Sequence, residues 1–343
     1  MNFYDEKEKE NTLKLREQLN TLPSFCKEYF RAISETTTSK TRLSYSYDLH
    51  IFFKYLKDSN PIFKNKDNFE LDDLDKVTFQ DIYEYMEYLK LYSSDKKETI
   101  NSESGIKRKI ASLRSFYKYF YNNELIKTNP AAKVSLPKLR EKEIIRLEVD
   151  EVAKLLDQIE SGENLTGKEK KFHEATKVRD MALISLLLGT GMRVSECVGI
   201  NLDDIDIENT AIRIKRKGAK EAIIYYSDEV ANYLDVYLKE RKNIENVSKD
   251  SENALFLSLQ NKRINVRSVE KLVKKYALKI NPLKHITPHK LRSTFGTNLY
   301  RETDDIYLVA SVLGHNDVNT TKKHYAAIDS DKKRNARNTV KLR

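Results

Sequence analysis

The segment Gly189-Thr190-Gly191-Met192-Arg193-Val194-Ser195-Glu196 decides how the second half of this chain is interpreted. It follows residues 178–188, whose apolar run predicts a buried helix. Two glycines indicate a sharp turn, and Arg193 stands at the start of the next helix, within helical reach of Glu196. Taken alone, such a pair is most often a surface ion pair, so its meaning depends on the other motifs.

Three further motifs follow. Residues 213–220 belong to a predicted hairpin whose two strands are joined around residues 216–219, and five of these eight residues are basic. Next comes His289-Lys290-Leu291-Arg292, which Thr287-Pro288 precedes, so a proline in the first helical turn would place His289 and Arg292 on one face. The last is Leu313-Gly314-His315, and Tyr325 follows it.

Each motif alone has an ordinary explanation, such as a solvated hairpin, a chance pairing or a packed tyrosine. Together, two arginines, a lysine and two histidines suit the neutralisation of a phosphodiester transition state. No carboxylate cluster of the kind that holds Mg²⁺ stands beside them, so we expect no metal. A tyrosine hydroxyl is a nucleophile that can carry a covalent phosphate ester.

The composition agrees with a polyanionic partner. The 343 residues hold 62 Lys and Arg against 52 Asp and Glu, a net charge of +10, and nucleic acid is the first candidate. No apolar run approaches the roughly 18 to 20 residues of a membrane span. Because the start of the chain is charged and the two cysteines lie far apart, we expect neither secretion nor a disulfide framework, and a cytoplasmic location.

Periodicity and breakers predict a mainly α fold in two domains. Only one glycine precedes Gly162, and residues 43–57, 78–89 and 104–121 show helical apolar spacing. Three short strands are expected at 200–207, 210–215 and 221–226, giving a mostly helical second domain with a small three-stranded antiparallel sheet. The expected order is a polar leader at 1–20, a helical bundle at 21–127, an extended linker at 128–146, a catalytic domain at 147–331 and a basic tail at 332–343. The leader has room for one helix, and the catalytic domain includes a loop at 161–171.

In this order, the motifs resemble the signature of the tyrosine recombinases. The match covers the GTGxRxSE box, the KG hairpin, the PHxLR box, the LGH box and the terminal tyrosine, and so the whole second domain. Thr128-Asn129-Pro130-Ala131 resembles the segment that ends the SAM-like, core-binding domain of the family. The chain is most similar to the Xer type, and its long 161–171 segment resembles the single-recombinase Xer proteins of Firmicutes.

The resemblance implies a role for each matching residue. Arg193 and Arg292 would bind the non-bridging oxygens of the scissile phosphate. Tyr325 would attack phosphorus, giving a 3′-phosphotyrosine and a free 5′-hydroxyl, and Lys217 would protonate the leaving oxygen.

The remaining roles support that chemistry. His289 would act as general base, His315 would hydrogen-bond the phosphate, and Glu196 would orient its neighbours. Because the phosphotyrosine keeps the energy of the broken bond, rejoining needs no ATP. The absence of a GxxxxGK[ST] phosphate loop agrees with that, and we expect no cofactor.

Three positions depart from the family pattern. Tyr325 lies ten residues after His315, one more than is usual. Ser293 stands where a histidine is frequent, and Arg216 stands where a glycine often precedes the lysine. The last departure leaves Lys215 and Lys220 as alternatives to Lys217 for the general acid.

The resemblance also implies double-stranded DNA as the partner, held by both domains in a C-shaped clamp. A homo-tetramer on two sites would exchange strands through a Holliday junction, and a role for an accessory or activating protein stays open. The candidates for DNA contact are Lys107, Arg108, Arg114, Arg213, Lys215, Arg216, Lys220 and Lys290. A type IB topoisomerase and a non-catalytic DNA-binding regulator are the alternative functions, and chromosome-dimer resolution and mobile-element integration are the alternative roles.

Overall fold

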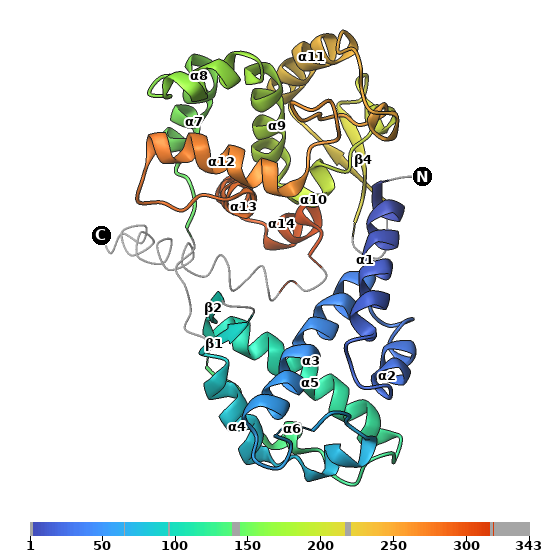
Figure 1. Ribbon diagram of the computed structural model, residues 1–343. Coiled ribbons are helices and arrows are strands. Elements are labelled where there is room, and N and C mark those ends of the chain that lie inside the picture. Colours follow the sequence, from blue (N-terminus) through green and yellow to red (C-terminus); the bar gives the residue numbers. More distant parts are fainter. Residues whose placement is uncertain are drawn as a thin grey trace, which may run out of the picture. The chain divides into compact units, whose positions relative to one another are not determined.

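The computed structural model describes residues 3–64, 66–94, 97–138, 145–216, 221–315 and 318. The chain divides into two compact units, residues 1–142 and 143–343, and each is described by itself. Both are built mainly of helices, and the second contains a three-stranded antiparallel sheet (Figure 1). The predicted fold class is confirmed.

The first unit is a bundle of helices with one short hairpin. Capping side chains set where its helices begin. Thr38 and Ser102 accept backbone N–H groups, and Thr78 forms with Asp81 the capping box that a Thr-x-x-Asp spacing in the sequence indicates. Its elements are α1 (Phe3–Leu19), α2 (Cys26–Ala32), α3 (Ser39–Ser59), the 3₁₀ turn η1 (Leu71–Lys76), α4 (Phe79–Tyr88), β1 (Leu91–Ser94), β2 (Lys97–Ile100), α5 (Glu103–Asn122) and α6 (Pro130–Lys133).

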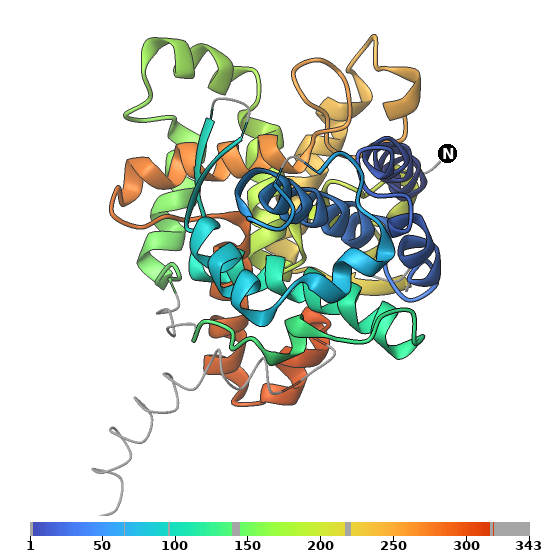
Figure 2. The ribbon, with the colours of Figure 1, turned by 60° about the horizontal axis from the view of Figure 1, so that its bottom comes forward.

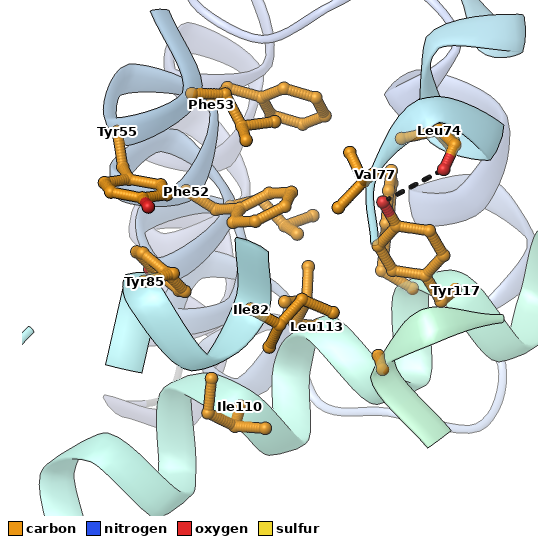
Figure 3. Close-up of a cluster of buried hydrophobic side chains, with 14 of the residues drawn as sticks. Phe52, Phe53, Tyr55, Leu74, Val77, Ile82, Tyr85, Ile110, Leu113 and Tyr117 are labelled. Carbon is orange, nitrogen blue, oxygen red and sulfur yellow. Dashed lines mark hydrogen bonds between the residues drawn. The ribbon is translucent and has the colours of Figure 1, made fainter. Parts of the chain in front are cut away.

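Aromatic side chains form the core of this unit. Phe52, Tyr85 and Tyr117 are almost fully buried between α3, α4 and α5 (Figure 3). The Tyr117 hydroxyl donates a hydrogen bond of 3.4 Å to the carbonyl of Leu74, which gives this buried polar atom a partner. The many aromatic residues of the unit therefore serve mainly in packing, as large side chains that bury much apolar area each.

The start of this unit contains the one helix for which the sequence left room, whereas its end differs from the sequence-based expectation. Residues 3–19 form a full helix that packs on α3, where the Ser39 hydroxyl donates to Glu8 at 2.6 Å. At the other end, Pro130–Lys133 is helical and Ala131 is fully buried, where we expected an extended linker. Proline is favourable at the first turn of a helix, so Pro130 begins α6 rather than breaking the chain.

The second unit is arranged around one buried helix. Residues 181–187 of α9 are buried all round, and α9 packs against α7, α11 and α13 (Figures 1 and 2). Its helices are α7 (Val149–Ser161), α8 (Gly167–Glu174), α9 (Lys177–Thr190), α10 (Val194–Cys197), α11 (Asp228–Lys242), α12 (Val266–Ile280), α13 (Pro288–Thr303) and α14 (Ile306–Leu313). None of the helices in the described residues is long and apolar enough to cross a membrane.

The sheet has the strand order β3 (Ile205–Asp206), β4 (Ala211–Lys215) and β5 (Glu221–Tyr225), with Ile212 opposite Ile224. The first strand is shorter than predicted because residues 202–204 form a 3₁₀ turn. The expected loop at 161–171 also contains the start of α8, for which Thr166 and Glu169 form a capping box.

Candidate active site

The turn after α9 brings the site together. Gly191 ends the helix in the left-handed conformation, at φ +61°. A Cβ atom at this position would lie 2.3 Å from Cδ1 of Phe295 and 2.9 Å from Cδ2 of Leu313. Only glycine fits both the backbone conformation and this space. The turn therefore packs closely against α13 and the end of α14.

Arg193 begins the short helix α10 and is held by Glu196. The Glu196 carboxylate, only 4% exposed, accepts the Arg193 backbone N–H at 2.7 Å and its Nη1 at 2.8 Å. The Nη2 atom of Arg193 donates to the carbonyl of Gly314 at 3.4 Å. Since a guanidinium has five N–H donors, these contacts fix its orientation and leave donors for a further oxyanion.

Arg292 comes from α13, which begins at Pro288 as the sequence predicts. Its side chain is buried, with Nη1 donating to the Gly191 carbonyl at 2.7 Å and Nη2 to the Leu313 carbonyl at 2.5 Å. His289 lies one helical turn earlier and is exposed. Ser293 stands where a histidine is frequent in the family. Its hydroxyl donates to the His289 carbonyl at 3.1 Å, so the serine has a hydrogen-bond partner within its own helix.

The end of α14 supplies the remaining part of the site. Gly314 adopts φ +64°, and the backbone N–H of His315 donates to the carbonyl of Ala310 at 2.9 Å. This is a common way to close a helix with a left-handed glycine. It places the half-buried His315 directly beyond the carbonyls that Arg193 and Arg292 contact.

The structure thus brings three of the predicted motifs into one place. Arg193, Arg292 and the Gly314–His315 turn converge through the carbonyls of Leu313 and Gly314. Two guanidinium groups held on successive carbonyls can bind a phosphate and stabilise the charge of its transition state. Lys217, Lys220 and Tyr325 lie outside the described residues.

Sequence reasoning missed the position of Arg216. We expected it among the DNA contacts, whereas its Nη2 donates to the carbonyl of Val312 at 2.9 Å. The signal that could have found it was the departure itself, since an arginine replaces a residue that is often glycine in the family. Of the other predicted DNA contacts in this unit, Arg213 is exposed and its Nε lies 3.4 Å from the Asp204 carboxylate, whereas Lys215 and Lys290 are half-buried.

The candidates for DNA contact in the first unit have different surroundings. Lys107 is half-buried on α5, whereas Arg108 makes two hydrogen bonds, of 2.5 and 2.7 Å, to the buried Asp48. Burial raises the pKa of Asp48, and the hydrogen bonds from Arg108 oppose that rise. Because a buried carboxylate is costly without its partner, Arg108 has a structural task whether or not it meets DNA.

Arg114 is engaged by the backbone. Its Nε donates to the carbonyl of Ala131 at 3.1 Å, and its Nη2 donates to the carbonyl of Val134. These bonds hold α6 and the residue that follows it against α5. The geometry favours a packing role over the phosphate contact that we expected from the sequence.

Replacing Arg114 with alanine should therefore lower stability rather than DNA affinity. We expect a loss of about 1–3 kcal/mol in the free energy of unfolding, because two carbonyls lose a charged donor. Urea unfolding and a DNA titration of the folded variant measure the two effects separately. Lys107→Ala is the matched control on the same helix, and it should leave stability within about 0.5 kcal/mol. A stable Arg114→Ala variant with weakened DNA binding would contradict the packing role.

Comparisons with known proteins identify the class to which this fold and site belong. Residues 145–332 match the model of the phage integrase family, and residues 21–136 match the phage integrase SAM-like domain. The tyrosine recombinase XerC of Caldanaerobacter subterraneus is 35% identical over 90% of this chain and 84% of its own length. The tyrosine recombinase XerD of Oceanobacillus iheyensis is 30% identical over 86% of this chain and 90% of its own length.

Solved structures show the same fold. The XerH recombinase in a post-cleavage complex with palindromic difH aligns with a TM-score of 0.67 at 21% identity, over 97% of this chain and 89% of that one. The Tn1549 transposon integrase in complex with circular intermediate DNA aligns with a TM-score of 0.62 at 22% identity, over 88% and 94%.

The chain belongs to the phage integrase family. It is a tyrosine recombinase of Xer-like or integrase-like type, an enzyme that breaks and rejoins DNA. The resemblance drawn from the motifs is confirmed at this level.

Proposed function

We propose that this chain is a site-specific recombinase in which Tyr325 forms a covalent 3′-phosphotyrosine with DNA. The observation that carries the proposal is the convergence of Arg193, Arg292 and the Gly314–His315 turn, ahead of Tyr325 in the sequence. In the proposed reaction the two guanidinium groups hold the non-bridging oxygens of the scissile phosphate. His315 adds a hydrogen bond to the same phosphate.

The remaining roles concern protons. His289 takes the proton of the tyrosine hydroxyl, and Lys217 gives a proton to the 5′-oxygen as its bond to phosphorus breaks. Glu196 keeps Arg193 in place, as its two hydrogen bonds support. The phosphotyrosine ester preserves the energy of the broken bond, so the reverse attack by a 5′-hydroxyl rejoins DNA without ATP or metal.

The assembly that we propose is a homo-tetramer on two double-stranded sites, which exchanges strands in pairs through a Holliday junction. The likeness to XerC and XerD over most of the chain supports a chromosomal role, the resolution of chromosome dimers in the cytoplasm. The 161–171 segment supports the single-recombinase type, which acts without a second recombinase. Integration or excision of a mobile element is the alternative role.

Recombination by the purified chain alone tests this proposal. We expect hybrid products when two differently labelled duplexes, each carrying the site that the protein protects from nuclease, are incubated with it. Relaxation of supercoiled DNA without hybrid products would indicate a type IB topoisomerase. Binding without any covalent adduct on a nicked site would indicate a regulator that lacks activity.

A further inference from the structure

Arg216 lies at the carbonyl end of α14, directly after strand β4. Its guanidinium donates to the carbonyl of Val312 and packs on the Cα atom of Gly314. A Cβ atom on Gly314 would lie 2.1 Å from Nη1 and 2.4 Å from Cζ of Arg216. Within the described residues the buried Nε of Arg216 has no hydrogen-bond partner. The guanidinium is therefore fixed by its close packing against Gly314 together with its hydrogen bond to Val312.

Three arginines thereby contact three successive carbonyls. Arg216 contacts the carbonyl of residue 312, Arg292 that of residue 313 and Arg193 that of residue 314. The last carbonyls of a helix lack partners within the helix and carry partial negative charge, which favours cations there. Two of these arginines belong to motifs shared with the family, whereas Arg216 replaces a residue that is often glycine in it.

We propose that Arg216 is a positioning residue that fixes the end of β4 to the α14 turn and so sets where the general acid stands. The inference rests on the proposed function. Lys217 is the next residue in the sequence after Arg216. Arg216 is the last described residue before the lysine, and it is anchored on the same carbonyl row that Arg292 and Arg193 contact.

The step that Arg216 supports is proton donation to the leaving group. As the bond from the Tyr325 oxygen to phosphorus forms, the bond from phosphorus to the 5′-oxygen breaks. That oxygen takes the electron pair and a proton from the Lys217 ammonium, which becomes a neutral amine. Without the contact between Arg216 and the Val312 carbonyl, the Lys217 ammonium is less often in position to give its proton. The 5′-oxygen must then leave more often without that proton.

A change of leaving group separates this role from the others. A 5′-bridging sulfur in place of oxygen leaves without a proton, because a thiol, which ionises near pH 8.5, is a far stronger acid than an alcohol. We expect Arg216→Ala to slow cleavage of the oxygen substrate by a factor on the order of 10². Cleavage of the sulfur substrate should stay within about threefold of the unchanged protein, as should DNA affinity.

Three variants complete the test. Arg193→Ala should be slow on both substrates, because it acts on the phosphate. Lys239→Ala removes an exposed charge on α11 and should leave both rates unchanged. Arg216→Lys keeps the charge without the flat guanidinium, so its cleavage rate on the oxygen substrate should lie between those of Arg216→Ala and the unchanged protein. It gives the same comparison of substrates if Arg216→Ala unfolds at the assay temperature.

The outcomes are distinct. Equal slowing of Arg216→Ala on both substrates would overturn the proposal, and so would an unchanged rate on the oxygen substrate. If the unchanged protein cleaves neither substrate, the proposed function itself is wrong.

Discussion

Replacing Tyr325 with phenylalanine is expected to abolish the covalent protein–DNA adduct while DNA binding persists. The substitution removes one oxygen atom, the nucleophile, and leaves the positive charges of the site in place. Loss of a nucleophile can lower turnover by a factor on the order of 10⁶, so cleavage should fall below detection. Denaturing gel electrophoresis after incubation with a nicked, labelled site shows the adduct directly.

Tyr307→Phe is the matched control for this prediction. Tyr307 lies on α14 in the same unit, 65% exposed, and should form the adduct at the normal rate. Tyr325 is the only tyrosine that follows His315 in the sequence. An adduct that persists in Tyr325→Phe and disappears in Tyr307→Phe would move the nucleophile to α14 and remove the basis of the proposed mechanism.

Arg292→Lys should abolish most activity and also weaken the fold. Lysine keeps the positive charge but cannot span the carbonyls of Gly191 and Leu313 as the guanidinium does. We expect cleavage to fall by a factor on the order of 10³, as when an arginine that stabilises a phosphoryl transition state is lost. The free energy of unfolding should fall by about 1–3 kcal/mol, because a buried carbonyl loses its donor.

Arg301→Lys provides the comparison on the same helix. Arg301 pairs with Glu148 at 3.0 Å near the surface, so its replacement should change stability by less than about 1 kcal/mol and leave cleavage intact. Single-turnover cleavage and thermal unfolding of both variants give the two effects. Full activity in a folded Arg292→Lys variant would show that the guanidinium is not needed at the phosphate.

Most helices of this chain were predictable because their apolar residues recur at helical spacing and their caps are explicit. The Thr78–Asp81 box and the apolar run of α9 are examples, and the structure confirms both. The β1–β2 hairpin was missed because Leu91–Ser94 and Lys97–Ile100 are short and mixed in polarity. Helix α8 was missed because it is mostly polar, and only its cap indicates it.

Sequence reasoning named the residues of the site better than it placed them. The order of the motifs identified Arg193, Arg292 and His315 as neighbours, and the structure brings them together. It could not place Arg114 or Arg216, because a basic side chain on a helix or hairpin suits DNA and a backbone carbonyl equally well. Only the tertiary fold decides which carbonyl lies within its reach.

The carbonyl row at residues 312–314 has a consequence for how freely this site can vary. A backbone oxygen is present whatever side chain its residue carries, so substitutions at Val312 or Leu313 that preserve packing keep all three acceptors. Gly314 is the exception, because any side chain there would collide with Arg216. A library that randomises these three positions should therefore return active clones with varied residues at 312 and 313 and glycine alone at 314.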